Sequence, residues 1–578
     1  MNRWPLLLVT LLAGMAWAIL RVQVPTPLPH TAPADQFSAG RAMADVRLLA
    51  SVPHPTGSPA AARVVANLER RLASLGFTVR QVETPLPADA AKRLSSRGGD
   101  ASKPAISLVA VRKGANPALP AVALMAHHDS VIASPGAADD IAGVAVMLEI
   151  ARAIPQATQR RDLVLVITDA EEQGLVGARA IYAPGTAADP IAARTGVLIN
   201  LEARGGGGRA MMFQTGPGNG ELVRLLGQTT PGVAASSVAV TVYESLPNNT
   251  DFTPVLLRGI AGLNFAFIGE AWAYHSPLAT PDALEQGALQ NLGDSALGIT
   301  RALLMADTLP APAPNAVFAA APIFGLIVYP AVFGLMPVLA AAALLGLAAW
   351  WRRGEWSVGG SLLAVGQMLI TLIIAGLLML GLNLLSGSVG AEYYDRLAAL
   401  PRLEIVAGLA ALAALLFMAS ADAGTYWDRW LSLVLLCLID AMAVQILLPG
   451  AGPIFAWPAL LASIGLIIAA WTADSGDRLN WPPLVPALLL AIPGLTLTAE
   501  LAHFGFLGVG AAMPFALVPL LIPALALLAP AIPAGPRQPA LLAAAAVLVI
   551  AAGVALWVRF DPVAPSVPPY AGTEKSQG

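Results

Sequence analysis

The second half of the chain consists of long apolar runs that carry almost no charged residues. Leu, Ala, Ile, Val and Gly predominate from residue 316 to residue 560. Inside a bilayer every backbone polar group must be hydrogen-bonded within the protein, so runs of about 20 apolar residues restrict this half to membrane-spanning helices. We expect spans at residues 331–351, 360–384, 404–421, 430–448, 453–473, 483–500, 511–530 and 538–557, with 316–330 as an interfacial lead-in.

Positive charges in the short loops indicate how these spans are oriented, because Lys and Arg are retained on the cytoplasmic side. Suppose that the first half of the chain lies on the outer side of the membrane. The inner loops then carry five such residues, and the outer loops and tail carry four. The inner ones are Arg352, Arg353, Arg429, Arg478 and Arg537, and the outer ones are Arg396, Arg402, Arg559 and Lys575. Arg352 and Arg353, directly after a span, form a local stop signal. We therefore expect a multi-pass membrane domain at 316–560 and a polar tail at 561–578.

A further apolar segment lies near the start of the chain, at residues 4–20, directly after Asn2 and Arg3. Its length is just sufficient to cross a bilayer. We interpret residues 1–21 as an uncleaved signal anchor, with a removable signal peptide as the alternative because Ala16-Trp17-Ala18 resembles a cleavage site. In either case the following domain is exported. The Pro-rich residues 22–35 are typical of a linker.

Residues 36–310 differ in composition from the rest and form the expected soluble domain. They hold most of the charged side chains and four of the six histidines, whereas the whole chain is 56% hydrophobic and only 12% charged. The net charge of −3 gives no basic surface for nucleic acid. The single cysteine, Cys437, lies in an apolar run, so the soluble domain has neither disulfides nor a thiol ligand.

Apolar strand-like segments alternate with helical patterns in the soluble domain. We expect strands at 121–129, 162–172, 196–203 and 260–269 and helices at 140–154, 174–182 and 282–307. Such alternation favours an α/β fold in which helices sandwich a mostly parallel mixed sheet. Ligands bind such sheets beyond the carboxyl ends of the strands.

Histidines and acidic residues gather where these strands end. His127 and Asp129 follow the first strand, Asp169, Glu171 and Glu172 the second, Glu202 the third and His275 the last. Zinc without thiolates prefers imidazole and carboxylate ligands, and a pair of ions needs a bridging carboxylate and a base for the attacking water. Five ligands and one spare carboxylate are present: His127, Asp139, Glu171, Glu172, Glu202 and His275.

Five motifs in this domain resemble, in order and spacing, those of the co-catalytic di-zinc aminopeptidases (metallopeptidase family twenty-eight). They are "HHDS" at 127–130, "GAADDIAG" at 136–143, "DAEEQGLVGAR" at 169–179, "NLEARG" at 200–205 and "YHSPLATPD" at 274–282. The resemblance covers residues 40–308 and is strongest to the membrane-bound endoplasmic-reticulum metallopeptidase branch, which shares the layout of an exported domain and a multi-span tail. It implies the zinc exopeptidase fold and two zinc ions per chain.

The same resemblance implies a role for each matching residue. The ligands would be His127 and Glu202 for one zinc, Glu172 and His275 for the other, and Asp139 as the bridge. Glu171 would be the general base, and Asp129 would orient the His127 imidazole. The family pattern also implies a cis peptide bond between Asp139 and Asp140.

Two assignments have neighbouring alternatives. The H-x-D spacing selects His127 over His128 as the ligand, and alignment on the following Ala-Gly selects Asp139 over Asp140 as the bridge. Glu202 stands where many soluble family members have Asp, so its longer side chain could shift the second site.

Several other residues resemble positions near the family's active site. Asp251 is either a site residue or a helix N-cap, and Tyr243 or Tyr274 could donate to the reaction's oxyanion or serve in packing. We interpret His54 as structural. The "RGGGGR" stretch at 204–209 is interpreted as a flexible turn, because no strand and helix flank it as in a phosphate-binding loop.

These features together predict a membrane-anchored zinc exopeptidase that hydrolyses N-terminal residues of peptides on the extracytoplasmic (periplasmic or lumenal) side. Alternatives on the same fold are a carboxypeptidase and a glutaminyl cyclase. A noncatalytic receptor is disfavoured because every ligand position is filled. A transporter is disfavoured because the spans hold few ionisable groups, such as Asp440 and Glu500, and no repeat.

Overall fold

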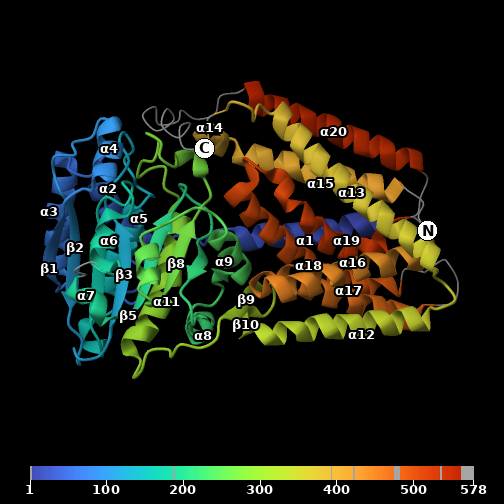
Figure 1. Ribbon diagram of the computed structural model, residues 1–578, viewed down its shortest axis with the longest axis horizontal. Coiled ribbons are helices and arrows are strands. Elements are labelled where there is room, and N and C mark those ends of the chain that lie inside the picture. Colours follow the sequence, from blue (N-terminus) through green and yellow to red (C-terminus); the bar gives the residue numbers. More distant parts are fainter. Residues whose placement is uncertain are drawn as a thin grey trace. The chain divides into compact units, whose positions relative to one another are not determined.

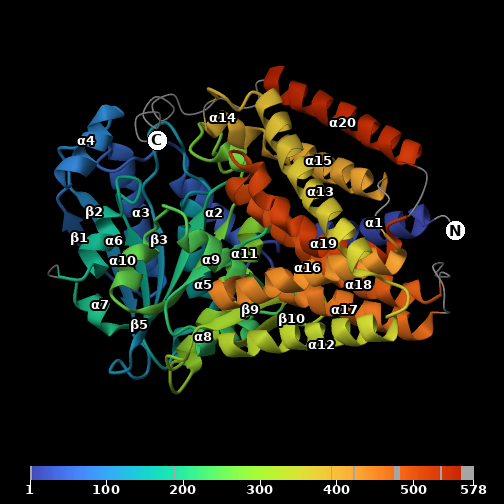
Figure 2. The same ribbon diagram turned by 45° about the vertical axis from the view of Figure 1, so that its right-hand side comes forward.

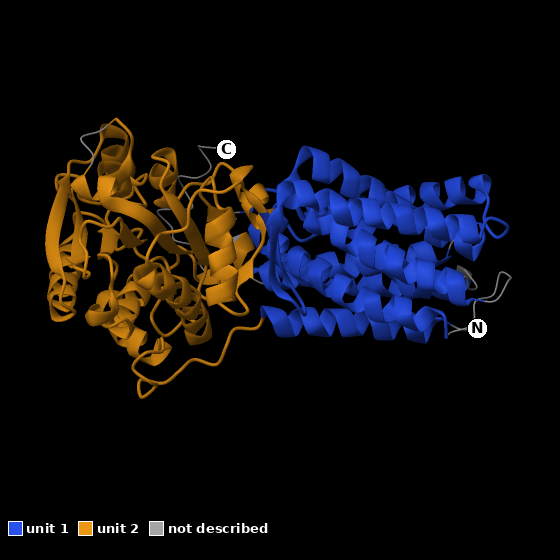
Figure 3. Cartoon of the chain, turned by 90° about the horizontal axis from the view of Figure 1, so that it is seen from below, with its two compact units in different colours: residues 1–22, 317–391, 399–563 blue, residues 23–316, 392–398, 564–578 orange. Residues whose placement is uncertain are grey.

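The computed structural model describes residues 3–185, 189–391, 393–420, 424–473, 482–533 and 537–560. The chain divides into two compact units, coloured separately in Figure 3. Unit 1 comprises residues 1–22, 317–391 and 399–563, and unit 2 comprises residues 23–316, 392–398 and 564–578. The expected polar tail at 561–578 lies outside the described residues.

Unit 2 is built on an eight-stranded mixed sheet with the strand order β1-β2-β4-β3-β5-β8-β6-β7. The strands are β1 (Thr78–Thr84), β2 (Ala105–Arg112), β3 (Ala121–His127), β4 (Leu163–Thr168), β5 (Thr195–Ala203), β6 (Met211–Thr215), β7 (Ala234–Ala235) and β8 (Ala261–Phe267). The central strands β4, β3, β5 and β8 run parallel, and β1 and β2 pair antiparallel with their neighbours. Strand β6 pairs antiparallel with β8 and parallel with β7. This architecture confirms the fold class predicted for the soluble domain.

Helices cover both faces of the sheet, which is why every residue of β3 is buried (Figure 1). On one face, Ala123 and Met125 of β3 pack with residues of α6 (Val176–Tyr182), α7 (Pro190–Arg194) and α10 (Phe252–Leu257). Contacts of β3 and β5 with α5 (Ile141–Ala153) and α11 (Gln286–Met305) complete the layer structure. The remaining helices of this unit with eight or more residues are α2 (Ala39–Leu49), α3 (Pro59–Ser74), α4 (Ala88–Ser96), α8 (Gly220–Thr229) and α9 (Ser237–Glu244).

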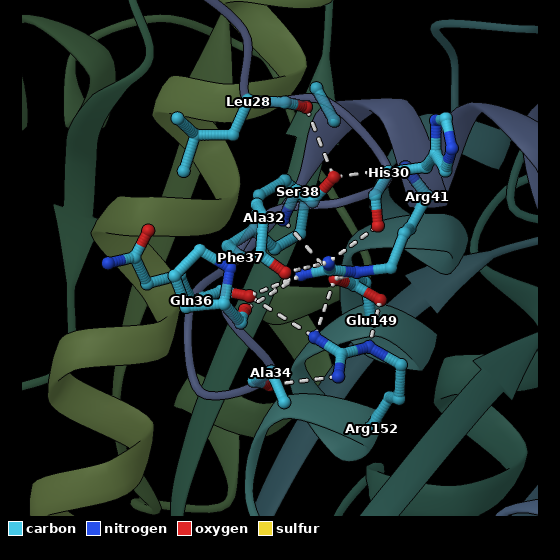
Figure 4. A network of polar contacts seen from close by, with 12 residues as sticks. Leu28, His30, Ala32, Ala34, Gln36, Phe37, Ser38, Arg41, Glu149 and Arg152 are labelled. Carbon is cyan, nitrogen blue, oxygen red and sulfur yellow. Dashed lines mark hydrogen bonds and ion pairs between the residues drawn. The ribbon is translucent and has the colours of Figure 1, made fainter.

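The Pro-rich segment expected as a linker is held on unit 2 by two arginines that share one buried glutamate. Arg41 of α2 and Arg152 of α5 both pair with Glu149, which is 1% exposed. Both guanidinium groups also donate to main-chain oxygens of residues 30–36 (Figure 4). Main-chain carbonyls thus complete the hydrogen bonding of charges that burial would otherwise leave unsatisfied. This part of the segment is an ordered strap rather than a free linker.

Unit 1 is a helical bundle (Figure 2). Among its described residues, nine helices are long and apolar enough to cross a membrane. They are Trp4–Val22, Ala331–Trp351, Val358–Leu385, Leu400–Ser420, Tyr426–Leu447, Pro453–Thr472, Leu484–Gly510, Pro514–Ala531 and Gln538–Phe560. The first, α1, packs along α18 (Leu484–Gly505), where Arg21 forms an ion pair with Glu500. Glu500, at the end of the expected span 483–500, thus has a charged partner.

Two segments of unit 1 differ from simple spans. The expected interfacial lead-in is a hairpin of β9 (Ala316–Ala321) and β10 (Gly325–Pro330). The segment expected as a helix at 511–530 is a series of short pieces: a 3-10 helix at Pro514–Leu520, α19 at Leu521–Leu528 and a 3-10 turn at Ala529–Ala531. Repeated prolines explain this, because each removes a backbone donor from the helix.

Candidate metal centre

Four parallel strands deliver the predicted site residues to one edge of the sheet. Strand β3 ends at His127, β5 carries Glu202 near its end, and the loop after β8 carries His275. Strand β4 ends at Thr168, four residues earlier than expected. The reason is that Ala170 has a left-handed φ of 60° and the carbonyl of Glu171 accepts from Gly174 and Leu175, so that 169–175 forms a turn. This turn presents Glu171 and Glu172 to the edge.

The structure brings the five predicted ligands together in two neighbouring groups. One group contains His127, Asp140 and Glu202, and the other contains Asp139, Glu172 and His275, with possible ligand atoms within 4.8 Å of one another in each. Asp139 lies between them: its Oδ1 is 3.0 Å from Nε2 of His127 and its Oδ2 is 3.1 Å from Nε2 of His275. Glu172 Oε1 is 2.9 Å from the same His275 nitrogen. A carboxylate in this position can bridge two ions.

Asp140 also lies near His127 and Glu202, but its oxygens are engaged elsewhere. It is the N-cap of α5, where Oδ1 accepts from the Gly143 amide at 3.1 Å, and Oδ2 accepts from the His127 amide at 3.3 Å. Helix N-caps are commonly Asp for this reason. The Asp139–Asp140 peptide bond is cis, as the resemblance implied. The two adjacent aspartates therefore face different partners, and Asp139 is the one with two histidines.

Asp129 is placed to order both sides of the site. Its main-chain oxygen is 3.0 Å from Nδ1 of His127, and its Oδ1 is 3.4 Å from the same nitrogen. Its carboxylate also accepts the amides of Glu171 at 3.1 Å and Glu172 at 3.3 Å. This second role was not predicted, because amide positions in a loop leave no signal in the sequence. His128, the alternative to His127, points away and contacts the Ile106 carbonyl at 2.9 Å.

Glu171 has the environment of a base. Burial raises its pKa well above the usual value, and the nearby carboxylates of Glu202 and Glu172 raise it further. Among the described residues, no group is hydrogen-bonded to its carboxylate. The side chain can therefore accept a proton without breaking an existing contact.

The remaining electrostatics show a pocket of crowded carboxylates. Burial raises the pKa of Glu202 to about 8, with further contributions from Asp139 and Asp251. Burial also tends to raise the pKa of Asp139, yet hydrogen bonds from His127 and His275 hold it well below its usual range. Burial lowers the pKa of His275, but Glu172 and Asp139 raise it to about 9. His127 and His275 thus both contact carboxylate oxygens, as is usual at a site that binds metal cations.

Asp251 occupies the N-cap position of α10, but its side chain makes no capping hydrogen bond. One carboxylate oxygen accepts from the Thr168 hydroxyl and the other, Oδ1, is buried without a partner among the described residues. Burial raises its pKa to about 6. The position is thus that of a helix cap, whereas the side chain lies among the groups around the site.

The two candidate tyrosines differ in position. Tyr243 of α9 packs edge-on against Phe213, and its buried hydroxyl lies close enough to Glu202 and Glu171 for their charges to raise its pKa, after burial, which has the largest effect. Tyr274 instead stacks on the His275 ring, with centroids 3.7 Å apart. His54, interpreted as structural, is fully buried; its amide donates to the Ser130 hydroxyl at 3.0 Å and its carbonyl accepts from the Ser130 amide at 3.4 Å.

The glycine-rich stretch at 204–209 is a fixed clasp and not the flexible turn expected. The amides of Gly206 and Gly207 donate to the carbonyls of Glu270 and Gly269, and Gly208 donates to Glu285 at 2.7 Å. A Cβ at Gly205 would lie 2.0 Å from the Gly269 oxygen, so only glycine allows this approach. Because these amides are engaged, the stretch does not form a phosphate cradle.

The donor set fits zinc. Both groups offer imidazole nitrogen and carboxylate oxygen, and the chain's one cysteine is buried in a helix of unit 1. Without thiolates, these are the ligands of catalytic zinc sites. Asp129 supplies the outer contact to His127 that such ligands usually have.

Parts of the chain are similar in sequence to known proteins. Residues 107–300 match the sequence model of Peptidase family M28. Endoplasmic reticulum metallopeptidase 1 of Mus musculus is 37% identical over 189 residues, which is 32% of this chain and 20% of that protein. Vacuolar membrane protease of Schizosaccharomyces pombe is 27% identical over 280 residues, 46% of this chain and 31% of that protein. The chain thus spans about a fifth to a third of these relatives.

A solved structure with a similar arrangement is an aminopeptidase from Aneurinibacillus sp. strain AM-1. It is 19% identical, covers 49% of this chain and 97% of its own, and has a TM-score of 0.38.

Proposed function

From the match of residues 107–300 to Peptidase family M28, we propose that the protein is a membrane-anchored, zinc-dependent exopeptidase that removes N-terminal residues from peptides. The observation that carries the proposal is Asp139, whose two oxygens face His127 and His275 at 3.0 and 3.1 Å. This supports two zinc ions per chain, held by His127 and Glu202, by Glu172 and His275, and by Asp139 for both. Apart from Asp139, each ligand would then serve one ion.

Two bound zinc ions would polarise the scissile carbonyl and lower the pKa of the attacking water. Glu171 takes one proton from that water as its oxygen attacks the carbonyl carbon. When the carbon–nitrogen bond breaks, Glu171 gives this proton to the leaving amine. Tyr243, with its hydroxyl near Glu202 and Glu171, is the tyrosine placed to donate to the oxyanion, while Tyr274 holds the His275 ring.

The charge of the site favours an amino terminus over a carboxyl terminus. Eight acidic residues gather around it: Asp129, Asp139, Asp140, Asp169, Glu171, Glu172, Glu202 and Asp251. Three of them, Asp129, Asp139 and Glu172, form ion pairs with His127 or His275. Two divalent ions would balance only part of this negative charge. An incoming ammonium group would be attracted, whereas a substrate carboxylate would be repelled.

Hydrolysis of a peptide library tests this proposal directly. We expect trimming from the amino end, loss of activity with a zinc chelator, recovery on adding Zn²⁺, and no cleavage of the same peptides when they are N-acetylated. Trimming from the carboxyl end would identify a carboxypeptidase instead. Cyclisation of N-terminal glutamine without hydrolysis would identify a glutaminyl cyclase.

We further propose that the peptidase domain lies on the extracytoplasmic side of the membrane, in line with Arg3 before α1 and Arg352-Arg353 after α12 (Leu335–Trp351). Cysteine labelling in intact cells with a membrane-impermeant maleimide tests this. The native Cys437 is buried, which keeps the background low. Ser74→Cys, at an exposed position of unit 2, should be labelled, whereas Gly354→Cys, in the loop after α12, should react only after lysis. The opposite pattern would reverse the orientation.

A further inference from the structure

Three buried side-chain amides form a row across the neighbouring strands β5, β8 and β6, two residues before Glu202 on β5. Asn200 of β5 pairs in register with Asn264 of β8, and Asn264 pairs with Gln214 of β6. The side chains of Asn200 and Asn264 are fully buried, and Gln214 is 7% exposed. Three adjacent amides inside an apolar sheet are costly to bury unless they are hydrogen-bonded, so their partners indicate what the row does.

The hydrogen bonds of this row run in one direction and end on Glu202. Asn264 Nδ2 donates to Gln214 Oε1 and Thr250 Oγ1, both at 3.0 Å, so its Oδ1 faces Asn200. Asn200 Nδ2 donates to that oxygen at 3.1 Å and to Oε1 of Glu202 at 3.2 Å. Turning the Asn200 amide over would set its oxygen against two acceptors. The row therefore fixes which way the Asn200 amide points.

Asn200 and Glu202 lie two residues apart in one strand, so both side chains stand on the same face. That face also carries His127, two residues after Met125 of β3. Glu202 Oε1 is occupied by Asn200, whereas Oε2 receives no hydrogen bond from the row. Glutamate has one more side-chain torsion than aspartate, so its carboxylate can rotate more freely. The hydrogen bond from Asn200 restricts this rotation.

We propose that Asn200 is a positioning residue that holds Glu202 Oε1 and leaves Oε2 as the one metal-ligand oxygen of this carboxylate. The inference rests on the proposed function, because it takes the His127–Glu202 group as a metal site. Without the Asn200 amide, both oxygens of Glu202 are free to bind the metal, and the coordination number at this site rises. The Asn264–Gln214 part of the row acts through Asn200.

Cobalt substitution of the full-length protein tests the inference with a readout other than activity. The visible absorption of Co²⁺ weakens as its coordination number rises. We expect Asn200→Ala to weaken this absorption and to lower the affinity of one of the two sites by about 10- to 100-fold. Asn264→Ala is the matched control: it removes a partner of Asn200 but keeps the Glu202 contact, so it should shift both quantities in the same direction by less.

Asn200→Asp keeps the side-chain volume and replaces the donor with an acceptor, so it serves in place of Asn200→Ala if the cavity prevents folding. A purely structural role would lower the thermal midpoint and leave the cobalt spectrum and affinity as in the wild type, which would overturn the inference. Wild-type protein that binds fewer than two ions would contradict the proposed function itself. These two failures are therefore distinguishable.

Discussion

Glu171→Gln is expected to abolish peptide hydrolysis while both zinc ions stay bound. The glutamine amide has the same size as the carboxylate but cannot take a proton from water. Loss of a general base typically costs about 10²- to 10⁴-fold in rate. Zinc should remain because Glu171 belongs to neither ligand group. Turnover should be measured together with zinc content by elemental analysis of the purified protein.

The variant should also fold normally, since among the described residues nothing is hydrogen-bonded to the Glu171 carboxylate. Glu83→Gln, at an exposed position of β1, is the matched control and should leave hydrolysis, zinc content and thermal midpoint unchanged. Normal turnover by Glu171→Gln would show that another group is the base. Loss of zinc from this variant would instead place Glu171 among the ligands.

The centre of the fold and the ligand candidates could be predicted because they depend on local pattern. Strands β3 and β4 are almost continuous apolar runs, and β5 and β8 are mostly apolar, as expected for parallel strands buried on both faces. The ends of these strands are marked by the only dense His and acidic positions of the soluble domain. Parallel strands place such ends at one edge, so a ligand cluster follows from topology.

What could not be predicted depends on contacts between distant segments. The antiparallel strand β1 is of mixed composition, whereas β2 is mostly apolar and β6 is short, and all three are defined by their pairing with neighbours. The strap at residues 30–36 looks like a linker in the sequence because the residues that hold it, Arg41 and Arg152, lie on the helices α2 and α5. The glycine-rich clasp at 204–209 looks flexible for the same reason. Composition shows that such segments are intrinsically flexible, but it does not show the distant residues that hold them in one conformation.

Asp139→Asn is the second change with a large expected effect, because it alters the residue that we propose as the bridge between the two ions. Asparagine has one neutral oxygen where aspartate has two that share a negative charge. One ion would therefore lose this ligand, and the other would keep an uncharged one. We expect zinc content to fall from two ions per chain to one or fewer, and hydrolysis to fall by more than about 100-fold, beyond the effect of losing an outer-shell contact. Elemental analysis after gel filtration and peptide turnover measure both quantities.

Asp140→Asn is the matched control one residue away. Its Oδ1 can still accept from Gly143, but its amide nitrogen would face the His127 amide, which donates to Oδ2 in the wild type. That mismatch should lower stability by about 1–3 kcal/mol and leave both zinc ions in place. If Asp140→Asn lost zinc and Asp139→Asn kept it, Asp140 would be the bridge. The two variants therefore decide which of the adjacent carboxylates binds both ions, which the sequence alone could decide only by alignment. In the structure, Asp140 accepts hydrogen bonds from backbone amides, whereas Asp139 contacts two histidines.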